Sequence, residues 1–388
     1  MSSTVPRLQV VDALRGFAIV SIILLHNIEH YDLYYLPSNL PNWIRTFDSG
    51  IWKSLFFLFS GKSYAIFSLL FGLTFFIQSN NQEIKGKDFR ARFVWRLFLL
   101  FIFGLINSAF YQGDILTDYA VIGLFLIPVA RLNDKAVFWI ALVLMFQPYE
   151  WINFILAVQN PDIKIVDPAS WFYFDKMGEY ITGNSLIETW IGNLTNGKTA
   201  VFYWTWENGR IFQTLSLFML GMLAGRKSVF VASIESKRFW FRTIIISFML
   251  FLLLFTVKEG LNSWISNKAI RSPIVTIETS WTNMAFMLVM VSGFVLLFQT
   301  DFFYKLLNSF SSIGRMSLSN YIMMSIIGSF IYYGFGLGLY QYAGATYSLF
   351  IGILLAMLEG FFSSCWINRF NHGPLETIWH KMTWIGST

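Results

Sequence analysis

The sequence predicts an all-α integral membrane protein, a polytopic bundle of about ten transmembrane helices. Of its 388 residues, 55% are hydrophobic and only 13% are charged, which leaves too few polar side chains to cover a water-soluble surface. The apolar residues also gather in runs of about 20, the length that crosses a bilayer, and loops rich in charge, Pro, Gly or Asn separate these runs.

Ten apolar runs are candidates for spans, with predicted bounds 10–30, 52–78, 93–111, 114–131, 136–157, 207–226, 239–258, 276–299, 315–339 and 346–368. Most Lys and Arg fall in loops on the side of the amino terminus, which predicts that both termini are cytoplasmic. The longest loop, about 158–206, is then extracytoplasmic, and such loops often cover a site. No change in composition marks a second domain, so residues 1–388 are predicted to form a single membrane domain.

Composition also excludes several classes of protein. The net charge is +6, but the basic residues stand in loops beside apolar runs, so the expected partner is the membrane lipid bilayer and not nucleic acid. The single cysteine, Cys365, rules out an internal disulfide and a multi-cysteine zinc site, and no metal is expected. No small-x-small cleavage site follows the first apolar run, which indicates a retained helix.

Polar residues of the first helix are the main site candidates, because ionisable groups inside a membrane are costly. Arg15 and His26 are eleven residues apart, about three helical turns, so they share one face; His30 follows His26 by one turn, with Glu29 beside it. Alternatively, Arg15 extends to the headgroups, and Glu29 and His30 lie beyond the interface. For His26, which directly follows Leu24 and Leu25 and lies deeper than His30, a functional role is favoured.

Other candidates stand in later spans. Lys62 falls in the middle of the second span, where only an interior or cavity-facing position is tolerable. Asp114 and Asp118 open the fourth span one turn apart, although helix capping alone explains Asp114. Arg210 opens the sixth span. The ninth opens with Arg315, Ser317, Asn320 and Tyr321, for which capping and contact between helices are alternatives.

Five motifs, taken in order, carry a resemblance to a known family. They are Asp12-Ala13-Leu14-Arg15-Gly16-Phe17-Ala18, Phe67-Ser68-Leu69-Leu70-Phe71-Gly72, Gly113-Asp114-Ile115-Leu116, Gly314-Arg315-Met316-Ser317-Leu318-Ser319-Asn320-Tyr321 and Gly373-Pro374-Leu375-Glu376-Thr377-Ile378-Trp379. The chain resembles the bacterial membrane proteins of the domain of unknown function 418 family, the YeiB-like proteins, whose carboxyl-terminal region would cover about 210–388.

That family is more distantly similar to membrane acyltransferases, namely the acyltransferase type 3 proteins and the heparan glucosaminide N-acetyltransferases. Acyltransferase type 3 proteins carry an arginine, ten residues and then a histidine in the first helix, and Arg15 and His26 have this spacing. The resemblance implies transfer of an acyl group, acetyl in the first instance, from cytoplasmic acetyl-CoA to a glycan or lipid acceptor of the cell envelope. It also implies a multi-pass protein of the bacterial inner (plasma) membrane.

The resemblance and the charges together suggest roles for individual residues. The catalytic candidates are His26, Glu29, His30 and Asp118. The candidates for binding the cofactor are Arg15, Lys62, Arg315, Ser317, Asn320 and Tyr321, and those for the acceptor are Asp114, Tyr119 and Arg210. We expect a central polar cavity that opens toward the cytoplasm between the first, second, fourth and ninth spans.

Two other classes of function stay open. In a transporter or flippase the same buried charges would form a substrate or proton pathway. A sensor or assembly partner would need no chemistry at His26, and a homodimer is an open alternative for the oligomeric state. Close contacts between helices are expected at small residues, namely Gly104, Gly221, Gly225, Gly328, Gly334, Gly336 and Gly338.

Overall fold

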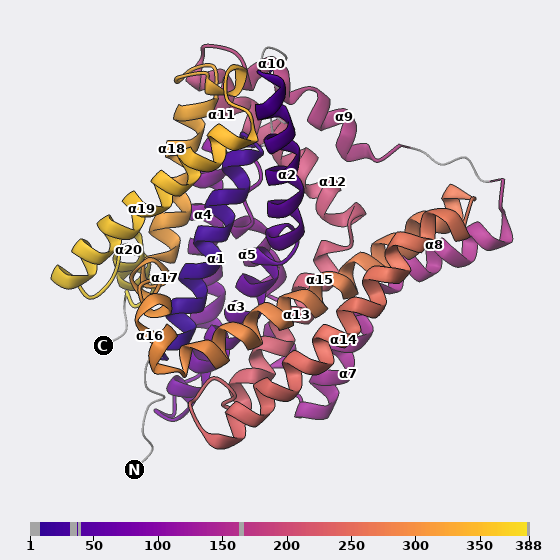
Figure 1. The fold of residues 1–388 in the computed structure, drawn as a ribbon. Coiled ribbons are helices and arrows are strands. Elements are labelled where there is room, and N and C mark those ends of the chain that lie inside the picture. The colour runs from indigo at the N-terminus through magenta and orange to yellow at the C-terminus, as the bar shows by residue number, and fades with distance from the viewer. Residues whose placement is uncertain (1–7, 32–36, 38–39, 163–166, 386–388) are drawn as a thin grey trace.

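The computed structural model describes residues 8–31, 37, 40–162 and 167–385, and within these ranges every regular element is a helix (Figure 1). The chain ends, on which the predicted topology partly depends, lie outside the described residues. The α-helices are α1 (Gln9–Ile28), α2 (Asn42–Phe59), α3 (Ser63–Glu83), α4 (Arg90–Phe110), α5 (Leu116–Gly123), α6 (Leu126–Val129), α7 (Asp134–Met145), α8 (Pro148–Gln159), α9 (Ala169–Asp175), α10 (Met177–Ile181), α11 (Leu186–Gly192), α12 (Lys198–Glu207), α13 (Arg210–Arg226), α14 (Ile234–Trp264), α15 (Lys268–Phe298), α16 (Asp301–Asn308), α17 (Ser311–Arg315), α18 (Ser317–Tyr332), α19 (Ala345–Arg369) and α20 (Pro374–Thr383).

The predicted class, a helical membrane protein, is confirmed. Among the described residues, 6 stretches of helix are long and apolar enough to cross a membrane, or up to 7 if the bent pair α7–α8 forms one span. The bend of 42° between α7 and α8 interrupts the predicted span 136–157. A proline at the first position of α8 explains the break, because proline cannot continue the hydrogen bonding of the preceding helix.

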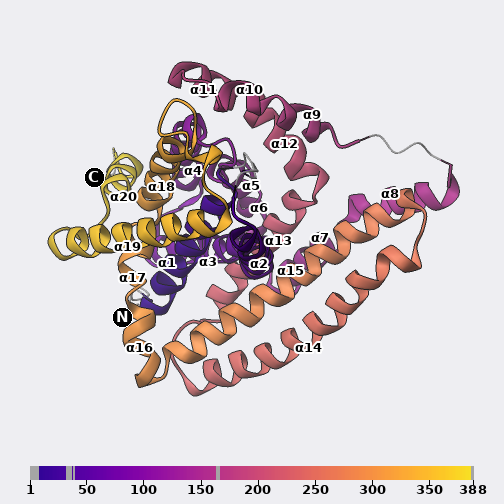
Figure 2. The ribbon, with the colours of Figure 1, turned by 45° about the horizontal axis from the view of Figure 1, so that its top comes forward.

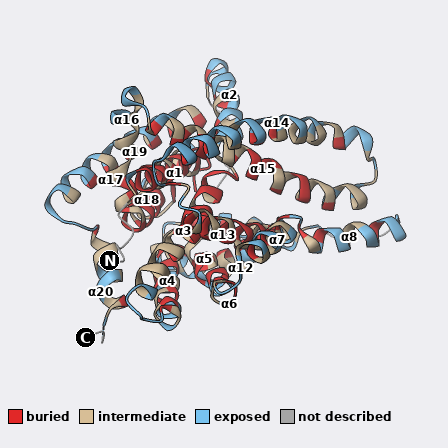
Figure 3. Ribbon diagram, turned by 90° about the horizontal axis from the view of Figure 1, so that it is seen from below, coloured by how far each residue is buried: buried red, intermediate tan, exposed pale blue. Residues whose placement is uncertain are grey.

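Helix α1 lies at the centre of the bundle, between α3, α17 and α19 (Figures 1 and 2). Within its apolar window 72% of the residues are buried, against 17% for α14, whose apolar side chains face outward. Figure 3 shows the same contrast, with buried residues concentrated in α1, α3 and α13 and exposed ones on α14 and α8. The polar residues of α1 are therefore inside the protein, whereas α14 is suited to face lipid.

Three local predictions are wrong. The second span is not one continuous helix, because it breaks between α2 and α3, where Gly61 has a φ of 78°. Lys62 lies at this break, although its side chain is buried in the interior, as expected. The run 114–131 forms the short helices α5 and α6 and not one span. The first helix ends at Ile28, and His30 has a left-handed backbone (φ 51°), so it does not continue the helical face of His26.

The long loop 158–206 is largely helical in its described part. It forms α9, α10, α11, a π-helical turn (Asn193–Gly197) and α12, which together cover the end of the bundle where α1 stops (Figure 1). The side chain of Asn193 donates to the carbonyl of Ala109 at 2.9 Å, which attaches this cover to α4.

Glycines bring two helix pairs into backbone contact. A Cβ on Gly16 of α1 would collide with the carbonyl of Phe310, and one on Gly314 of α17 would collide with the carbonyl of Asp12. Helices α3 and α13 meet in the same reciprocal way at Gly72 and Gly221. Such contacts hold membrane helices together, because lipid removes the hydrophobic driving force between helices.

The expectation for the small residues is confirmed at Gly221 but wrong at Gly338. Gly338 has a φ of 61° and no atom closer than 3.8 Å to an added Cβ, so it serves a turn and not a close contact. Gly16, Gly72 and Gly314 also make close contacts that were not predicted from the sequence.

The substitution Gly314→Ala should destabilise the protein by about 1–3 kcal/mol, because α1 and α17 would have to separate. Thermal unfolding in detergent measures this effect. The control is Gly50→Ala in α2, where an added Cβ meets no atom within 4 Å and helix propensity gains up to about 1 kcal/mol. Equal unfolding temperatures for both variants would contradict the role of the contact.

Candidate functional site

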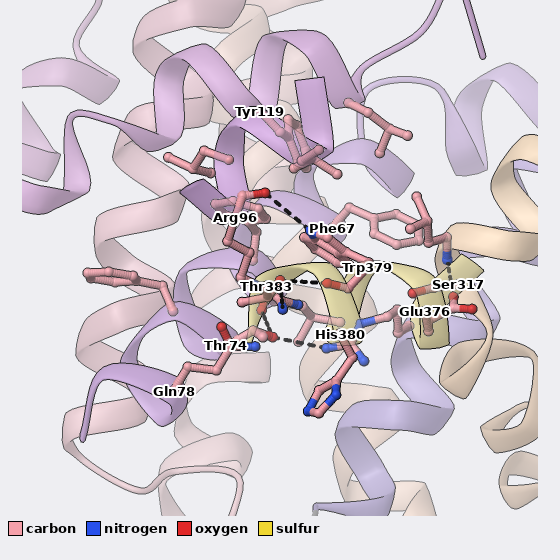
Figure 4. A pocket seen from close by; sticks show the side chains of 18 of the residues that line it. Phe67, Thr74, Gln78, Arg96, Tyr119, Ser317, Glu376, Trp379, His380 and Thr383 are labelled. Carbon is pink, nitrogen blue, oxygen red and sulfur yellow. Dashed lines mark hydrogen bonds between the residues drawn. The ribbon is translucent and has the colours of Figure 1, made fainter. Parts of the chain in front are cut away.

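A cavity of about 400 Å³ lies between α1, α3, α4, α5, α18 and α20 (Figure 4). The cavity is lined, as expected, by the first, second, fourth and ninth predicted spans, which contain α1, α3, α5 and α18. Helix α4, from the third predicted span, and the tail helix α20 form two further walls that were not expected. The polar and charged lining residues are Arg15, Thr74, Gln78, Arg96, Tyr119, Arg315, Ser317, Tyr321, His372, Glu376, His380 and Thr383.

One end of this cavity is basic. The Arg15 guanidinium donates to Thr74 Oγ1 at 3.0 Å and pairs with Asp12 at 3.3 Å. The Arg96 guanidinium stacks on the Trp379 ring at 3.6 Å, and Arg315 donates to the carbonyl of Asn371 at 3.0 Å. Three guanidinium groups at one mouth are suited to bind phosphates, which arginine can grip with two parallel hydrogen bonds.

The opposite end of the cavity is apolar and closed by two tyrosines. Tyr119 is 4% exposed and its hydroxyl donates to the carbonyl of Tyr64 at 2.8 Å, while the Tyr321 hydroxyl accepts from the Ile115 amide at 3.2 Å. In Figure 4 Tyr119 lies at the top of the view and His380 near the bottom, with Arg96 between them. The cavity therefore offers a charged entrance and an apolar interior to one elongated ligand.

Helix α20 is attached to the bundle by specific polar contacts. The Glu376 carboxylate accepts from the amides of Leu318 and Ser319 at 2.7 and 3.1 Å, so it caps the amino terminus of α18. The Trp379 indole N–H donates to the carbonyl of Arg96 at 3.1 Å. Because these contacts fix α20 against both α4 and α18, the tail forms a wall of the cavity.

A second group of polar side chains surrounds His26 at the other end of α1. His26 Nδ1 lies 2.8 Å from Glu29 Oε2 and 3.1 Å from the Tyr111 hydroxyl. The side chain of His26 is 16% exposed and that of Glu29 only 7%. A carboxylate beside Nδ1 favours the tautomer that carries its proton there, which leaves Nε2 as an acceptor.

Asp114 lies in the connection from α4 to α5, close to residues of both groups. Its buried carboxylate accepts from the Asn107 side chain at 3.0 Å and from the Thr117 amide at 2.9 Å. The ammonium group of Lys198, from α12, is 3.9 Å away. The same connection contacts His26 through Tyr111 and the cavity through Ile115, so it links both groups within five residues.

Several predicted site residues lie elsewhere. His30 Nε2 is 2.8 Å from the Ser348 hydroxyl of α19, and Asn320 bridges to Ser363 of α19 at 2.9 Å. Lys62 lies beside the rings of Phe57 and Phe286, outside the lining of the cavity. Arg210 stacks on Tyr64 at 4.2 Å, and Asp118 accepts from Thr205 at 3.3 Å.

Sequence reasoning missed Arg96, Tyr111 and Lys198. Arg96 and Lys198 belong to the Lys and Arg residues in or near predicted loops, and Tyr111 carries no charge that would single it out. Glu376 and Trp379 had a sequence signal, because both belong to the tail motif that carries the family resemblance.

These features define a helical membrane protein with an internal cavity, basic at its mouth and apolar at its closed end. Residues 224–386 match the model of the family described as "Protein of unknown function (DUF418)". The predicted resemblance to the YeiB-like family is thereby confirmed.

Relatives match over nearly the whole chain. The chain is 27% identical to "Uncharacterized protein YxaH" of Bacillus subtilis (strain 168), over 98% of this chain and 94% of that protein. It is 25% identical to "Uncharacterized protein YeiB" of Escherichia coli (strain K12), over 96% and 95% of the two chains. A 39.9 kDa protein from the amylase 3' region of Bacillus acidopullulyticus is 24% identical, over 97% and 94%. No solved structure matches the chain significantly.

The attachment of α20 should weaken at acid pH. Partial burial, His372 and Arg96 all lower the pKa of His380 below its usual value of about 6.5, so the attached helix favours the neutral imidazole. The contribution of the neutral imidazole to the attachment of α20 is therefore complete above the usual histidine pKa of about 6.5, and it is lost as the pH falls below that value.

Hydrogen exchange of residues 374–383, corrected for the intrinsic rate at each pH, measures this effect. We expect protection to fall between about pH 7 and pH 5 in the wild type, as the imidazole gains its proton. The change should be smaller in His380→Gln. Equal protection across this range in the wild type would contradict the prediction.

Proposed function

We propose that the protein is a membrane-embedded acyltransferase that moves an acyl group, acetyl in the first instance, from cytoplasmic acetyl-CoA to an extracytoplasmic acceptor. The observation that carries the proposal is the cavity that joins three guanidinium groups at its mouth to an apolar interior. Acetyl-CoA has the matching chemistry, with phosphates at one end and a long, weakly polar arm that carries the thioester at the other.

The proposal includes a topology. The bundle would have about ten spans with both termini on the cytoplasmic side of the bacterial inner membrane, in a transmembrane acyltransferase-like arrangement. The mouth of the cavity would then open on the side that holds most of the Lys and Arg, as the positive-inside rule requires. Helices α9–α12 would cover the outer face, where the acceptor arrives.

In this proposal Arg15, Arg96 and Arg315 bind the phosphates of the cofactor, and Tyr321 and Ser317 line its path. His26 is eleven residues from Arg15, about 16 Å along a helix with a rise of 1.5 Å per residue. A phosphate group and a reacting thioester must also lie well apart in acetyl-CoA. His26 does not line the cavity, so the proposal also requires that the end closed by Tyr119 and Tyr321 opens toward the histidine when the cofactor binds. The basic mouth and the histidine would then suit opposite ends of the same cofactor.

His26 supplies the chemistry in the proposed reaction. Its Nε2 takes the proton from an acceptor hydroxyl or amine, whose oxygen or nitrogen attacks the thioester carbonyl. The carbon–sulfur bond breaks, the acyl group stays on the acceptor, and the coenzyme A thiolate leaves and takes up a proton. Glu29 holds the tautomer and stabilises the imidazolium that forms, and Asp118 is the reserve candidate for the base.

The acceptor is proposed to be a sugar or a lipid headgroup of the cell envelope. Asp114 with Lys198, and Arg210 with Tyr64, provide hydrogen-bonding and charged groups near the helices that cover the outer face. A transporter is the second candidate. It is favoured by the buried carboxylate of Asp114 and the nearby Asp118 and Lys198, which would suit an ion or substrate pathway.

Calorimetry with acetyl-CoA tests the cofactor site. The wild type in detergent should bind, and Arg15→Ala and Arg96→Ala should each weaken binding by roughly 10- to 100-fold, the value of a hydrogen bond to a charged group. His26→Ala should leave binding unchanged. The control Lys85→Ala removes an exposed positive charge outside the cavity. Absence of binding at millimolar acetyl-CoA would overturn the cofactor assignment.

Transfer is measured with membrane vesicles that contain the protein and radiolabelled acetyl-CoA, by the label that enters the lipid and glycan fractions. His26→Ala should lower the rate by about 10²- to 10⁴-fold, the usual contribution of a general base. Glu29→Gln should also lower it, whereas Glu188→Gln, an exposed position, is the matched control. Binding without any transfer of label would favour the transporter, which an uptake assay then tests.

A further inference from the structure

A second cavity, of about 670 Å³, lies between α7, α13, α14 and α15 and shares no lining residue with the first. Its walls are almost entirely apolar and include Trp139, Leu220, Met284 and Leu288. The hydroxyl of Ser216, one of its few polar groups, is already used, because it donates to the carbonyl of Ala141 at 2.7 Å.

The surroundings of this cavity are suited to lipid and not to water. Helices α7 and α14 carry exposed apolar side chains next to the cavity, such as Phe138, Trp139 and Phe239. A water molecule needs two to four polar partners, which these walls do not offer. In a membrane, the hydrocarbon chain of a lipid is therefore the expected occupant.

Charged residues stand at one place along the wall. Lys135 and Lys227 line the cavity together with Asp134, which binds Lys227 at 2.7 Å and Arg226 at 3.0 Å. An adjoining surface hollow on α14 carries Arg238, Arg242 and Glu235, and both hollows share Phe239 and Thr243. The linings of the two hollows together contain four basic and two acidic residues, which leaves an excess of positive charge.

We propose that this cavity binds one phospholipid with an anionic headgroup. Its acyl chains occupy the space between α7 and the pair α14–α15, and its phosphate lies at Lys135 and Lys227, with Arg238 and Arg242 nearby. The charge explains the preference for an anionic headgroup, since each Lys or Arg near a membrane surface attracts anionic lipid. The lipid fills the space between helices that do not close on one another.

Native mass spectrometry of the delipidated protein, offered equal amounts of phosphatidylglycerol and phosphatidylcholine with identical chains, tests the proposal. The wild type should retain phosphatidylglycerol preferentially. The double variant Lys135→Ala/Lys227→Ala should lose about 25-fold in that preference, about fivefold per lysine. The control Lys85→Ala/Lys87→Ala removes two exposed lysines from another loop and should keep the preference.

Filling the cavity tests the position of the acyl chains. Leu288→Trp on α15 and Leu142→Trp on α7 narrow it from opposite walls, so a failure of one variant to fold leaves the other informative. Retention of both lipids should fall in a variant that keeps the unfolding temperature of the wild type. Equal retention of the two lipids by the wild type, or an equal loss in the control pair, would overturn the proposal.

Discussion

The backbone contact between α1 and α17, at Gly16 and Gly314, is the constraint on which the rest of the structure depends. It holds the helix that carries Arg15 and His26 against the start of the segment that carries Arg315 and Tyr321. A larger side chain at either glycine would separate these helices. Because lipid offers no hydrophobic force to close the gap, such contact by small residues is how a polar helix is kept inside the bundle.

The two polar groups at the ends of α1 are connected by the segment from Tyr111 to Ile115. Tyr111 contacts the imidazole of His26, while Ile115 lines the cavity and donates to Tyr321. Asp114, in the same segment, is held by Asn107 and Lys198. A ligand in the cavity would thus meet Ile115, which stands in the same short segment as Tyr111, the residue that contacts the histidine.

Arg15 and His26 were singled out from sequence alone, and both lie inside the protein. Their spacing is local, so helical periodicity places them three turns apart on one face. His30 was placed wrongly because the helix ends at Ile28 and the next residues take a left-handed backbone, which spacing does not reveal. The role of Arg96 was missed because its partner Trp379 is 283 residues away in the chain.

That the protein is a helical membrane protein follows from its sequence alone, because the length of an apolar run is a local property that must match the thickness of a bilayer. Which charged side chains contact one another depends on the packing of the helices. Lys198 reaches Asp114 across 84 residues, and α20 closes the cavity through Glu376 and Trp379. Such contacts depend on how helices pack against one another, and hydrophobic periodicity does not encode that packing.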